Sequence, residues 1–386
     1  MKGRRRHLIV WKLFRCAASP WLRRKFNFEP VPADIDGPCL ILANHNTDWD
    51  PFLVGLSFKQ HMYFVASEHI FRWGLLSWLI RWLFDPISRL KGTLATNTVL
   101  AVMRRLRRSF NVCLFAEGNR SWNGLTCDIL PSTGKLARSC RATLVTYKLE
   151  GGYFTSPRWG VSLRRGRMRG YAVGVYPPEV LSKMTVEEIN ALIKRDLFED
   201  AYARQRENPV PFKGKRIVEA LETTLFICPK CRSVGSLKSR GDRIFCGCGL
   251  NLRFTEYGFF EGDYLPFDNI TDWDRWQAQQ LYQLVQNTGN EPLFTDNNID
   301  IIEILGKHKS IRLGRGQLKL WRDRLEFAGQ TFHLREITGI SIHGAQAINL
   351  GVGSRNFELN CRSRFCGRKY MMAYEALKRQ ILHTGA

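Results

Sequence analysis

The sequence predicts an α/β domain with a mixed sheet flanked by helices, followed by a small cysteine-rich ribbon and a C-terminal β-rich domain closed by a helix. Between residues 30 and 205, short apolar runs alternate with helical stretches, which is typical of an α/β domain. Four cysteines then cluster between positions 228 and 248. From about residue 308 onward, short alternating runs precede one helical stretch. We therefore divide the chain into segments 1–29, 30–205, 224–256 and 300–386.

The α/β prediction depends on short apolar runs that end at polar residues. The run at 39–43 ends at Asn44 and fits a buried strand. The stretch at 185–202 has helical periodicity, and it carries Glu187 and Glu188 in its first turn, where acidic residues stabilise a helix. Residues 206–214 combine Pro, Gly and charged residues and are expected to form a linker. The expected strands span 39–43, 62–66, 111–115 and 144–147, and the expected helices span 98–108 and 185–202.

The chain is strongly basic, with 58 Lys and Arg against 35 Asp and Glu and a net charge of +23. This excess favours an anionic partner, such as nucleic acid, anionic lipid or a phosphorylated substrate, although it can also serve solubility alone. Residues 1–29 interleave Lys and Arg with large apolar residues, and no acidic residue precedes Glu29. This pattern favours a helix that lies in the headgroup region of an anionic membrane over an ordinary amphipathic helix.

A helix that spans a membrane is not expected, because no segment offers about 18 consecutive apolar residues. The longest apolar run, 73–80, carries Trp73 and Trp78 and fits either a buried core helix or an interfacial helix. No signal-peptide pattern opens the chain, and the 11 cysteines do not suggest a disulfide framework. We therefore expect a peripheral, monotopic protein on the cytoplasmic face of a membrane.

The segment from Asn44 to Asp50 follows an expected strand, where α/β sheets commonly present catalytic groups. His45 could take a proton from an alcohol, since imidazole has a pKa in the range that this step requires. Asp50 lies one turn further on and could bond the other ring nitrogen, which would fix the tautomer and stabilise the imidazolium. The pattern His-x-x-x-x-Asp is weak by itself, and an isolated histidine is more often structural.

Two further elements offer groups for a phosphate. Residues 115–121, Phe-Ala-Glu-Gly-Asn-Arg-Ser, follow another expected strand. Arg120 supplies a planar guanidinium that suits phosphate, and Gly118 lets the backbone approach a ligand closely. The segment Pro-Ile-Ser-Arg at 86–89 offers Arg89, which could share the same phosphate.

These elements resemble the motifs of the lysophosphatidic acid and glycerol-phosphate acyltransferases, which run Asn-His-x-x-x-x-Asp, Phe-x-x-Arg and Phe-Pro-Glu-Gly-Thr-Arg-Ser in this order. The resemblance covers about residues 38–150 and extends more loosely to about 205. The chain departs from the family at Pro86, Ala116 and Asn119, and its fourth motif lacks the usual proline. The His-Asp pair, the glutamate and both arginines are all present.

The resemblance implies a role for each matched residue. His45 would be the general base and Asp50 its partner. The acceptor site would comprise Arg89, Glu117, Gly118, Arg120 and Ser121. The hydroxyl of the acceptor would attack the thioester of acyl-CoA or of an acyl carrier protein, with no cofactor needed for catalysis.

Four cysteines form two close pairs, Cys228 with Cys231 and Cys246 with Cys248, and fourteen residues separate the pairs. This spacing resembles a zinc ribbon and suits tetrahedral Zn²⁺. Four thiolates leave no open coordination position, so such a site would be structural rather than catalytic. Free thiols, disulfides and an iron–sulfur cluster are the alternatives.

The last region resembles a pleckstrin-homology-like barrel, because several short strands are closed by one helix. A small β-rich accessory domain is the alternative, and neither fold by itself defines a function. The expected strands lie at 311–313, 318–321, 324–328, 331–334, 340–343, 347–350 and 357–361, and the expected helix lies at 368–382.

The motifs together predict a 1-acyl-glycerol-3-phosphate O-acyltransferase-like enzyme of phospholipid synthesis that acts at the membrane surface. It would transfer a fatty acyl group to a lysophosphatidic-acid-type acceptor. One alternative is an acyltransferase for another lysophospholipid or for glycerol phosphate. Others are a zinc-ribbon nucleic-acid-binding protein, which we disfavour because it leaves the motifs unexplained, and a catalytically silent lipid-binding scaffold.

Overall fold

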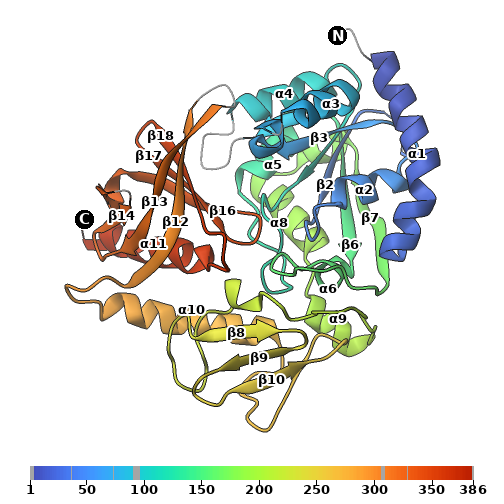
Figure 1. The fold of residues 1–386 in the computed structure, drawn as a ribbon. Helices are drawn as coiled ribbons and strands as arrows, with labels where there is room; N and C mark the ends of the chain where they lie inside the picture. Colours follow the sequence, from blue (N-terminus) through green and yellow to red (C-terminus); the bar gives the residue numbers. More distant parts are fainter. Residues whose placement is uncertain are drawn as a thin grey trace. The chain divides into compact units, whose positions relative to one another are not determined.

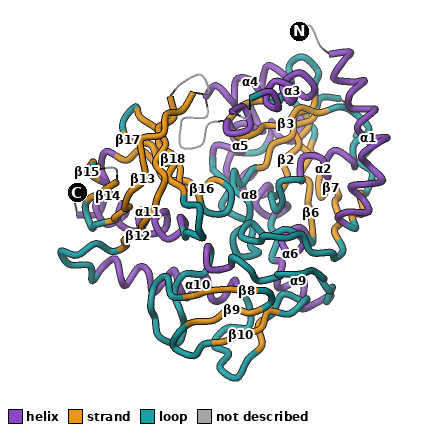
Figure 2. The backbone as a smooth tube through the Cα atoms, viewed as in Figure 1, coloured by secondary structure: helices purple, strands orange, loops and turns teal. Residues whose placement is uncertain are grey.

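The computed structural model describes residues 4–35, 37–72, 74–89, 96–305, 309–327 and 329–384. The chain forms two compact units. The first unit comprises Met1–Arg158 and Leu163–Gly214, and the second comprises Trp159–Ser162 and Lys215–Ala386. Figure 1 labels most of their helices and strands, and Figure 2 colours helices, strands and loops separately.

The first unit is built on a seven-stranded mixed sheet with the order β1-β7-β6-β2-β5-β3-β4 (Figure 1). Strands β6, β2, β5, β3 and β4 run parallel, so their carboxyl ends lie at one edge of the sheet. Strand β7 is antiparallel to β6, and β1 runs parallel to β7. The strands are β1 (Phe28–Pro30), β2 (Cys39–Ala43), β3 (Met62–Ser67), β4 (Ile87–Arg89), β5 (Asn111–Phe115), β6 (Thr143–Glu150) and β7 (Met168–Tyr176).

Helices cover both faces of this sheet. Successive side chains of a strand point to opposite faces, so alternate residues of β2 pack against different helices. Cys39, Ile41 and Ala43 of β2 pack against α1 and α2, whereas Leu40 and Leu42 pack against α4, α5 and α8. The helices are α1 (Arg4–Phe26), α2 (Asp50–Ser57), α3 (Leu75–Phe84), α4 (Thr96–Leu106), α5 (Ser132–Ser139), α6 (Gly152–Thr155), α7 (Pro178–Lys183), α8 (Val186–Leu197) and α9 (Ala201–Glu207).

The strands predicted at 39–43 and 111–115 are confirmed with the same bounds as β2 and β5. Those predicted at 62–66 and 144–147 are the cores of β3 and β6, and the helix predicted at 98–108 is α4. The single helix predicted at 185–202 is wrong, since it divides into α8 and α9. The division occurs because the backbone carbonyl of Glu199 accepts the Thr126 N–H instead of continuing the helix. The side chain of Asp200 then caps α9. The sequence pattern did not reveal β7.

The segment 206–214 ends at the boundary of the first unit, but it is packed rather than free. Phe212 is buried, and its ring packs so closely on Gly166 that a Cβ there would lie 2.1 Å from Cδ1 of the ring. The side chain of Gln205 donates to the carbonyl of Val210. The segment therefore leads from one unit to the other, as predicted for a linker, but it is packed against the first unit.

Helices α1 and α3 expose much of their apolar surface. Trp11, Leu22 and Phe26 of α1 are buried, but Leu13 is 64% exposed and Trp21 51%. In the predicted run 73–80, Trp73 lies outside the described residues, and the remainder forms most of α3. Leu75 is 87% exposed, so a buried core helix is wrong. Among the described helices, none is long and apolar enough to cross a membrane.

The second unit contains a four-stranded antiparallel ribbon, helix α10 and a seven-stranded antiparallel sheet (Figure 1). The ribbon has the order β11-β10-β9-β8. The larger sheet has the order β15-β14-β13-β12-β18-β17-β16. Strand β12, the first of these strands along the chain, pairs with β18, the last along the chain. The elements are β8 (Leu237–Arg240), β9 (Arg243–Cys246), β10 (Asn251–Phe254), β11 (Phe260–Glu261), α10 (Ile270–Gln286), β12 (Phe294–Leu305), β13 (Lys309–Leu320), β14 (Arg324–Phe327), β15 (Gln330–His333), β16 (Ile337–His343), β17 (Ala347–Val352), β18 (Arg355–Asn360) and α11 (Gly367–Thr384).

The C-terminal strands and the closing helix predicted from the sequence are present, with two differences. The strands predicted at 311–313 and 318–321 are one strand, β13, because it pairs with β12 along its whole length. Strand β12 was not predicted. Its register shifts between Asp296 and Ile299, and Asn298 has a positive φ of 60°, so the alternation that marks a strand is interrupted.

Candidate active site

The loops after β2 and β5 meet because these strands are parallel neighbours in the sheet. In the loop after β2, His45 Nδ1 lies 2.9 Å from Asp50 Oδ2. Asp50 is fully buried and opens α2. Its carboxylate also accepts hydrogen bonds from the N–H groups of Asn46 (2.6 Å) and Thr47 (2.9 Å) and from the Thr47 hydroxyl (2.6 Å). The predicted pair is thus brought together, with the carboxylate held by four donors.

The ring of His45 is fixed in a defined orientation. It stacks on Phe115 with 4.4 Å between ring centroids and 23° between planes. The side chain is 21% exposed, so it is reachable from solvent while its partner Asp50 is not. When Nδ1 carries a proton and donates it to Asp50, Nε2 is left as the basic nitrogen. This is the arrangement in which an imidazole can take a proton from a hydroxyl group.

Glu117 supports the backbone of His45. One carboxylate oxygen accepts the His45 N–H at 2.6 Å, and the other accepts the Cys127 N–H at 2.5 Å. Glu117 is 7% exposed, and this burial raises its pKa to about 8, although the two backbone donors act in the opposite direction. Both oxygens of this predicted acceptor-site residue therefore bind the protein itself.

Arg120 braces the same loop with three of its donors. Nε donates to the carbonyl of Asn46 at 2.8 Å, Nη1 to Asp48 Oδ2 at 2.8 Å and Nη2 to the carbonyl of Ser156 at 2.6 Å. Its side chain is 11% exposed, whereas that of Asp48 is 79% exposed. The guanidinium has five N–H groups, so two remain beyond these three bonds.

Gly118 and Ser121, the other two predicted acceptor-site residues of the 115–121 motif, shape its turn. The Ser121 hydroxyl is buried; it donates to the Leu125 carbonyl at 2.7 Å and accepts the Gly124 N–H at 3.0 Å. The Ser121 N–H donates to the carbonyl of His45 at 3.1 Å. Gly118 has a φ of +64°, and a Cβ there would meet nothing within 4 Å. The glycine is thus required by the backbone conformation rather than by a lack of space.

Arg89 lies at the same edge of the sheet but further along it. It ends β4, and the sheet order places β5 and β3 between β2 and β4. With strands about 4.8 Å apart, the end of β4 is roughly 14 Å from that of β2. No hydrogen bond or ion pair with another described residue occupies its guanidinium.

Asn44 and the glycine pair after β6 complete the support of the loop, and the sequence analysis assigned them no role. The Asn44 side chain bonds both the N–H (2.7 Å) and the carbonyl (2.9 Å) of Leu149. A Cβ on Gly152 would lie 2.8 Å from Asn46 Cβ, and one on Gly151 would lie 2.2 Å from the Arg167 carbonyl oxygen. An amide directly after a buried strand, together with two adjacent glycines after another, was the available signal.

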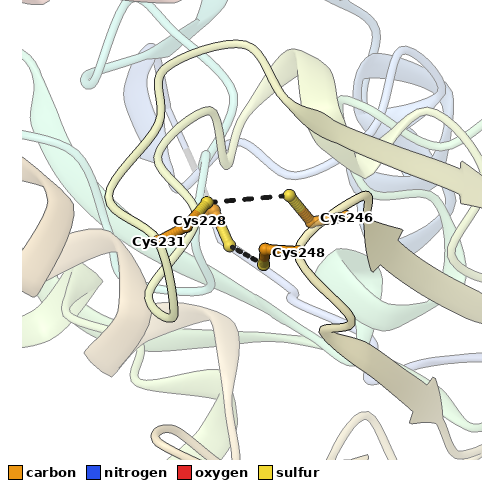
Figure 3. Close-up of side chains that lie close together, drawn as sticks. All are labelled: Cys228, Cys231, Cys246 and Cys248. Carbon is orange, nitrogen blue, oxygen red and sulfur yellow. Dashed lines mark hydrogen bonds between the residues drawn. The ribbon is translucent and has the colours of Figure 1, made fainter.

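The four predicted metal ligands also come together, in the second unit (Figure 3). All four Sγ atoms lie within 4.8 Å of one another. Cys228 and Cys248 are 3.6 Å apart, and Cys231 and Cys246 are 3.8 Å apart. The second unit therefore contains a cysteine cluster that could bind a metal ion.

Comparison with known proteins agrees with the geometry of the first unit. The model of the family described as Acyltransferase matches residues 23–150. None of the curated proteins compared with the chain matches it. Among solved structures, the chain is similar to the 1-acyl-sn-glycerophosphate (LPA) acyltransferase PlsC from Thermotoga maritima, with 16% identity and a TM-score of 0.42 over 54% of this chain and 84% of that chain.

His45, Asp50, Arg89 and residues 117–121 all lie within the matched range. The family resemblance predicted from the motifs is thus confirmed for this part of the chain: residues 23–150 form an acyltransferase domain.

Proposed function

We propose that this acyltransferase moves a fatty acyl group from an acyl thioester to the free hydroxyl of a lysophosphatidic-acid-type acceptor, as a 1-acyl-glycerol-3-phosphate O-acyltransferase does in phospholipid synthesis. The observation that carries this proposal is the contact between His45 and the buried Asp50 within the acyltransferase domain. The donor would be acyl-CoA or an acyl carrier protein. The alternative acceptors are another lysophospholipid and glycerol phosphate.

The reaction uses one proton twice. His45 Nε2 takes the proton from the acceptor hydroxyl, and Asp50 stabilises the imidazolium that forms. The acceptor oxygen attacks the thioester carbonyl, and the tetrahedral intermediate then collapses with loss of the thiolate. The imidazolium returns its proton to this thiolate. The products are the new oxygen ester and a free thiol, and the base is regenerated.

The anionic headgroup of the acceptor would bind to arginine. Arg89 is supported by its place at the carboxyl edge of the sheet and by the absence of a described partner for its guanidinium. Arg120 retains two N–H groups, but its main contacts hold the His45 loop, so we assign it a second role in positioning that loop. Glu117 and Ser121 would act through the same loop rather than by contact with the acceptor.

We also propose a location at a membrane surface, on its cytoplasmic face; the apolar surface that α1 and α3 leave exposed supports the membrane contact. Helix α1 combines Leu13 and Trp21 with Arg and Lys, and it contains no acidic residue. Lys25 lies 4.4 Å from the ring centroids of both Trp21 and Trp49, and Trp49 belongs to the catalytic loop. A lipid surface that binds α1 would therefore lie next to the loop that carries His45.

Two proposals concern the second unit. We propose that its cysteine cluster holds a structural Zn²⁺ with no part in acyl transfer, because four thiolates leave no open coordination position. We also propose that residues 294–384 form a pleckstrin-homology-like domain. The meander in which β12 pairs with β18, together with the closing helix α11, supports this assignment.

The proposal is tested with purified protein, one acyl-CoA and a panel of lysophospholipids and glycerol phosphate, with free thiol as the readout. We expect thiol release that depends on the acceptor and disappears in His45→Ala. The matched control is Lys59→Ala, since this side chain is 69% exposed. Turnover that survives in His45→Ala would overturn the assignment of the base. Salt-sensitive binding to nucleic acid without turnover would favour the alternative class of protein.

A further inference from the structure

The two cysteine pairs of the second unit are presented by two hydrogen-bonded turns that differ in length by one residue. In both turns, the residue after the second cysteine has a left-handed backbone: Arg232 with a φ of 60° and Gly249 with a φ of 89°. In both turns, the N–H of this residue donates to the carbonyl of the first cysteine, at 2.8 Å for Cys228 and 3.1 Å for Cys246. The shorter spacing of the second pair therefore does not prevent a hydrogen-bonded turn.

The sulfur positions fit one tetrahedral ion. Zn–S bonds of about 2.3 Å place the four sulfurs of a tetrahedron about 3.8 Å apart. The two separations marked by dashed lines in Figure 3 are 3.6 Å and 3.8 Å, and all four sulfurs lie within 4.8 Å of one another. A disulfide would need about 2.05 Å, so neither contact is a covalent bond. One ion at the centre would hold both turns, which come from distant parts of the ribbon sequence.

The segment before the first turn is tied to α10 through one buried amide. Gln277 accepts the Phe226 N–H at 2.9 Å and donates to the Thr224 carbonyl at 2.9 Å. The indole N–H of Trp273 donates to the Ile227 carbonyl at 3.0 Å. Gln277 and Trp273 are both fully buried. Residues 224–227, which lead directly into Cys228, are therefore fixed on α10.

The same network continues into the C-terminal sheet. Asp274 accepts from Gln277 at 2.7 Å and forms a two-point ion pair with Arg368 of α11, at 2.7 and 2.8 Å. Arg368 also donates to the Thr224 carbonyl at 3.2 Å. Helix α11 in turn bonds the sheet through the Tyr370 hydroxyl, which donates to Asp296 Oδ2 at 2.7 Å. Removal of one partner from a buried ion pair of this kind is strongly destabilising, because it leaves the other charge buried and unpaired.

We propose that the Zn²⁺ on these cysteines stabilises the whole second unit and not only the ribbon: loss of the ion loosens the sheet β12–β18, which contributes no ligand. The path is the first cysteine turn, residues 224–227, the Gln277–Asp274–Arg368 network and α11. This inference extends the proposed Zn²⁺ site and is independent of the acyl transfer reaction.

The test measures bound metal and then hydrogen–deuterium exchange of the full chain before and after treatment with a chelator. We expect one zinc ion per chain. After chelation, amide exchange in β12 and β18 should rise about tenfold or more, exchange in β2 and β6 of the first unit should stay unchanged, and added Zn²⁺ should reverse the effect. Iron in place of zinc, or no bound metal, would contradict the assignment of Zn²⁺ to the four cysteines. Faster exchange confined to residues 228–254 would overturn the coupling.

Two variants separate the ion from the coupling. Cys231→Ser should lose zinc and reproduce the effect of the chelator on β12 and β18, whereas Cys16→Ser, which alters another exposed thiol, should change neither. Gln277→Met keeps all four ligands, so it should retain zinc, while chelation should accelerate exchange in β12 less than in the wild type; the direct bond from Arg368 to the Thr224 carbonyl remains. Undiminished coupling in Gln277→Met would remove this residue from the path. If this variant does not fold with zinc bound, the Cys231→Ser result decides the question.

Discussion

Three groups of His45 each form a hydrogen bond with the protein. Its ring nitrogen binds Asp50, its N–H binds Glu117 and its carbonyl accepts the N–H of Ser121. The first contact orients the ring, and the other two fix the backbone against the loop after β5. Preorganisation of this kind matters because a small displacement of a catalytic base lowers the rate strongly. In the proposed reaction, the motif at 117–121 would therefore act in large part by holding the base.

Replacement of Asp50 by Asn should lower kcat by about 10²–10⁴-fold, because the amide neither stabilises the imidazolium nor selects the tautomer. Steady-state thiol release at saturating acceptor measures this effect. Asp34→Asn is the matched control, since this carboxylate is 68% exposed and pairs with Lys59. A kcat reduced less than tenfold would mean that Asp50 serves the fold more than the reaction.

Glu117 should make the stability of the first unit depend on pH. Burial raises its pKa to about 8 from a usual 4.5, so the folded chain holds this proton more tightly than the unfolded chain. The resulting contribution is complete below pH 4.5 and is lost as the pH rises to 8, by up to about 1.4 kcal/mol per pH unit. Denaturation of the wild type and of Glu117→Gln at pH 5, 6.5 and 8 measures it. Parallel profiles for the two proteins would contradict this assignment.

Helix α1 is joined to the catalytic domain along one face and exposed along the other. Its buried face rests on α2, where Gly55 leaves room for the ring of Trp11. Its composition is similar to that of α3, since both helices combine large apolar residues with arginine. The two faces should therefore respond to different substitutions.

Gly55→Ala should destabilise the first unit by about 1–3 kcal/mol, because the new Cβ would lie 2.3 Å from Cη2 of Trp11. Urea denaturation measures the change in the free energy of unfolding. Trp11→Leu in the same chain removes the clash, so the double variant should lose less than the sum of the two single variants. Additive effects would show that Trp11 does not press on this glycine.

Leu75→Glu should weaken binding to anionic vesicles by about tenfold or more, since an exposed leucine that enters lipid contributes roughly 1.5–3 kcal/mol. Co-sedimentation with phosphatidylserine-containing vesicles measures the Kd. Leu130→Glu is the matched control, because this leucine is 57% exposed in the same unit but lies outside α1 and α3. Equal losses in both variants would argue against a specific membrane face.

In the whole chain, the proposed catalytic pair and the cysteine cluster belong to different compact units. Each unit has its own sheet and its own core. Their stabilities should therefore respond separately to changes within one unit.

Chelation of the metal should leave kcat of the acyl transfer within about twofold while the second unit loosens. Thiol release before and after chelation, on the same sample used for metal analysis, measures this. Activity that falls in proportion to the zinc content would show that the first unit depends on the second.

The fold and the site were predictable to the extent that local patterns report burial. The runs at 39–43 and 111–115 are apolar because both faces of the sheet are covered, so β2 and β5 were found with their bounds. The cysteine cluster was predictable because two close pairs of cysteines at this spacing are typical of a site for one metal ion. Strand β12 was missed because a bulge shifts its alternation, and the break between α8 and α9 was missed because it depends on pairing with residues 125–126.

The chemical groups of the two sites can be read from the sequence: a histidine and an aspartate one turn apart, two arginines, and four thiols in two pairs. How the other groups of the motif are used depends on the folded chain, because hydrogen-bond partners distant in the chain are absent from any local pattern. The carboxylate of Glu117 binds the backbone 72 residues away, and Arg120 binds the carbonyls of Asn46 and Ser156. Parallel strands bring these partners to one edge of the sheet, and that packing determines what each polar side chain contacts.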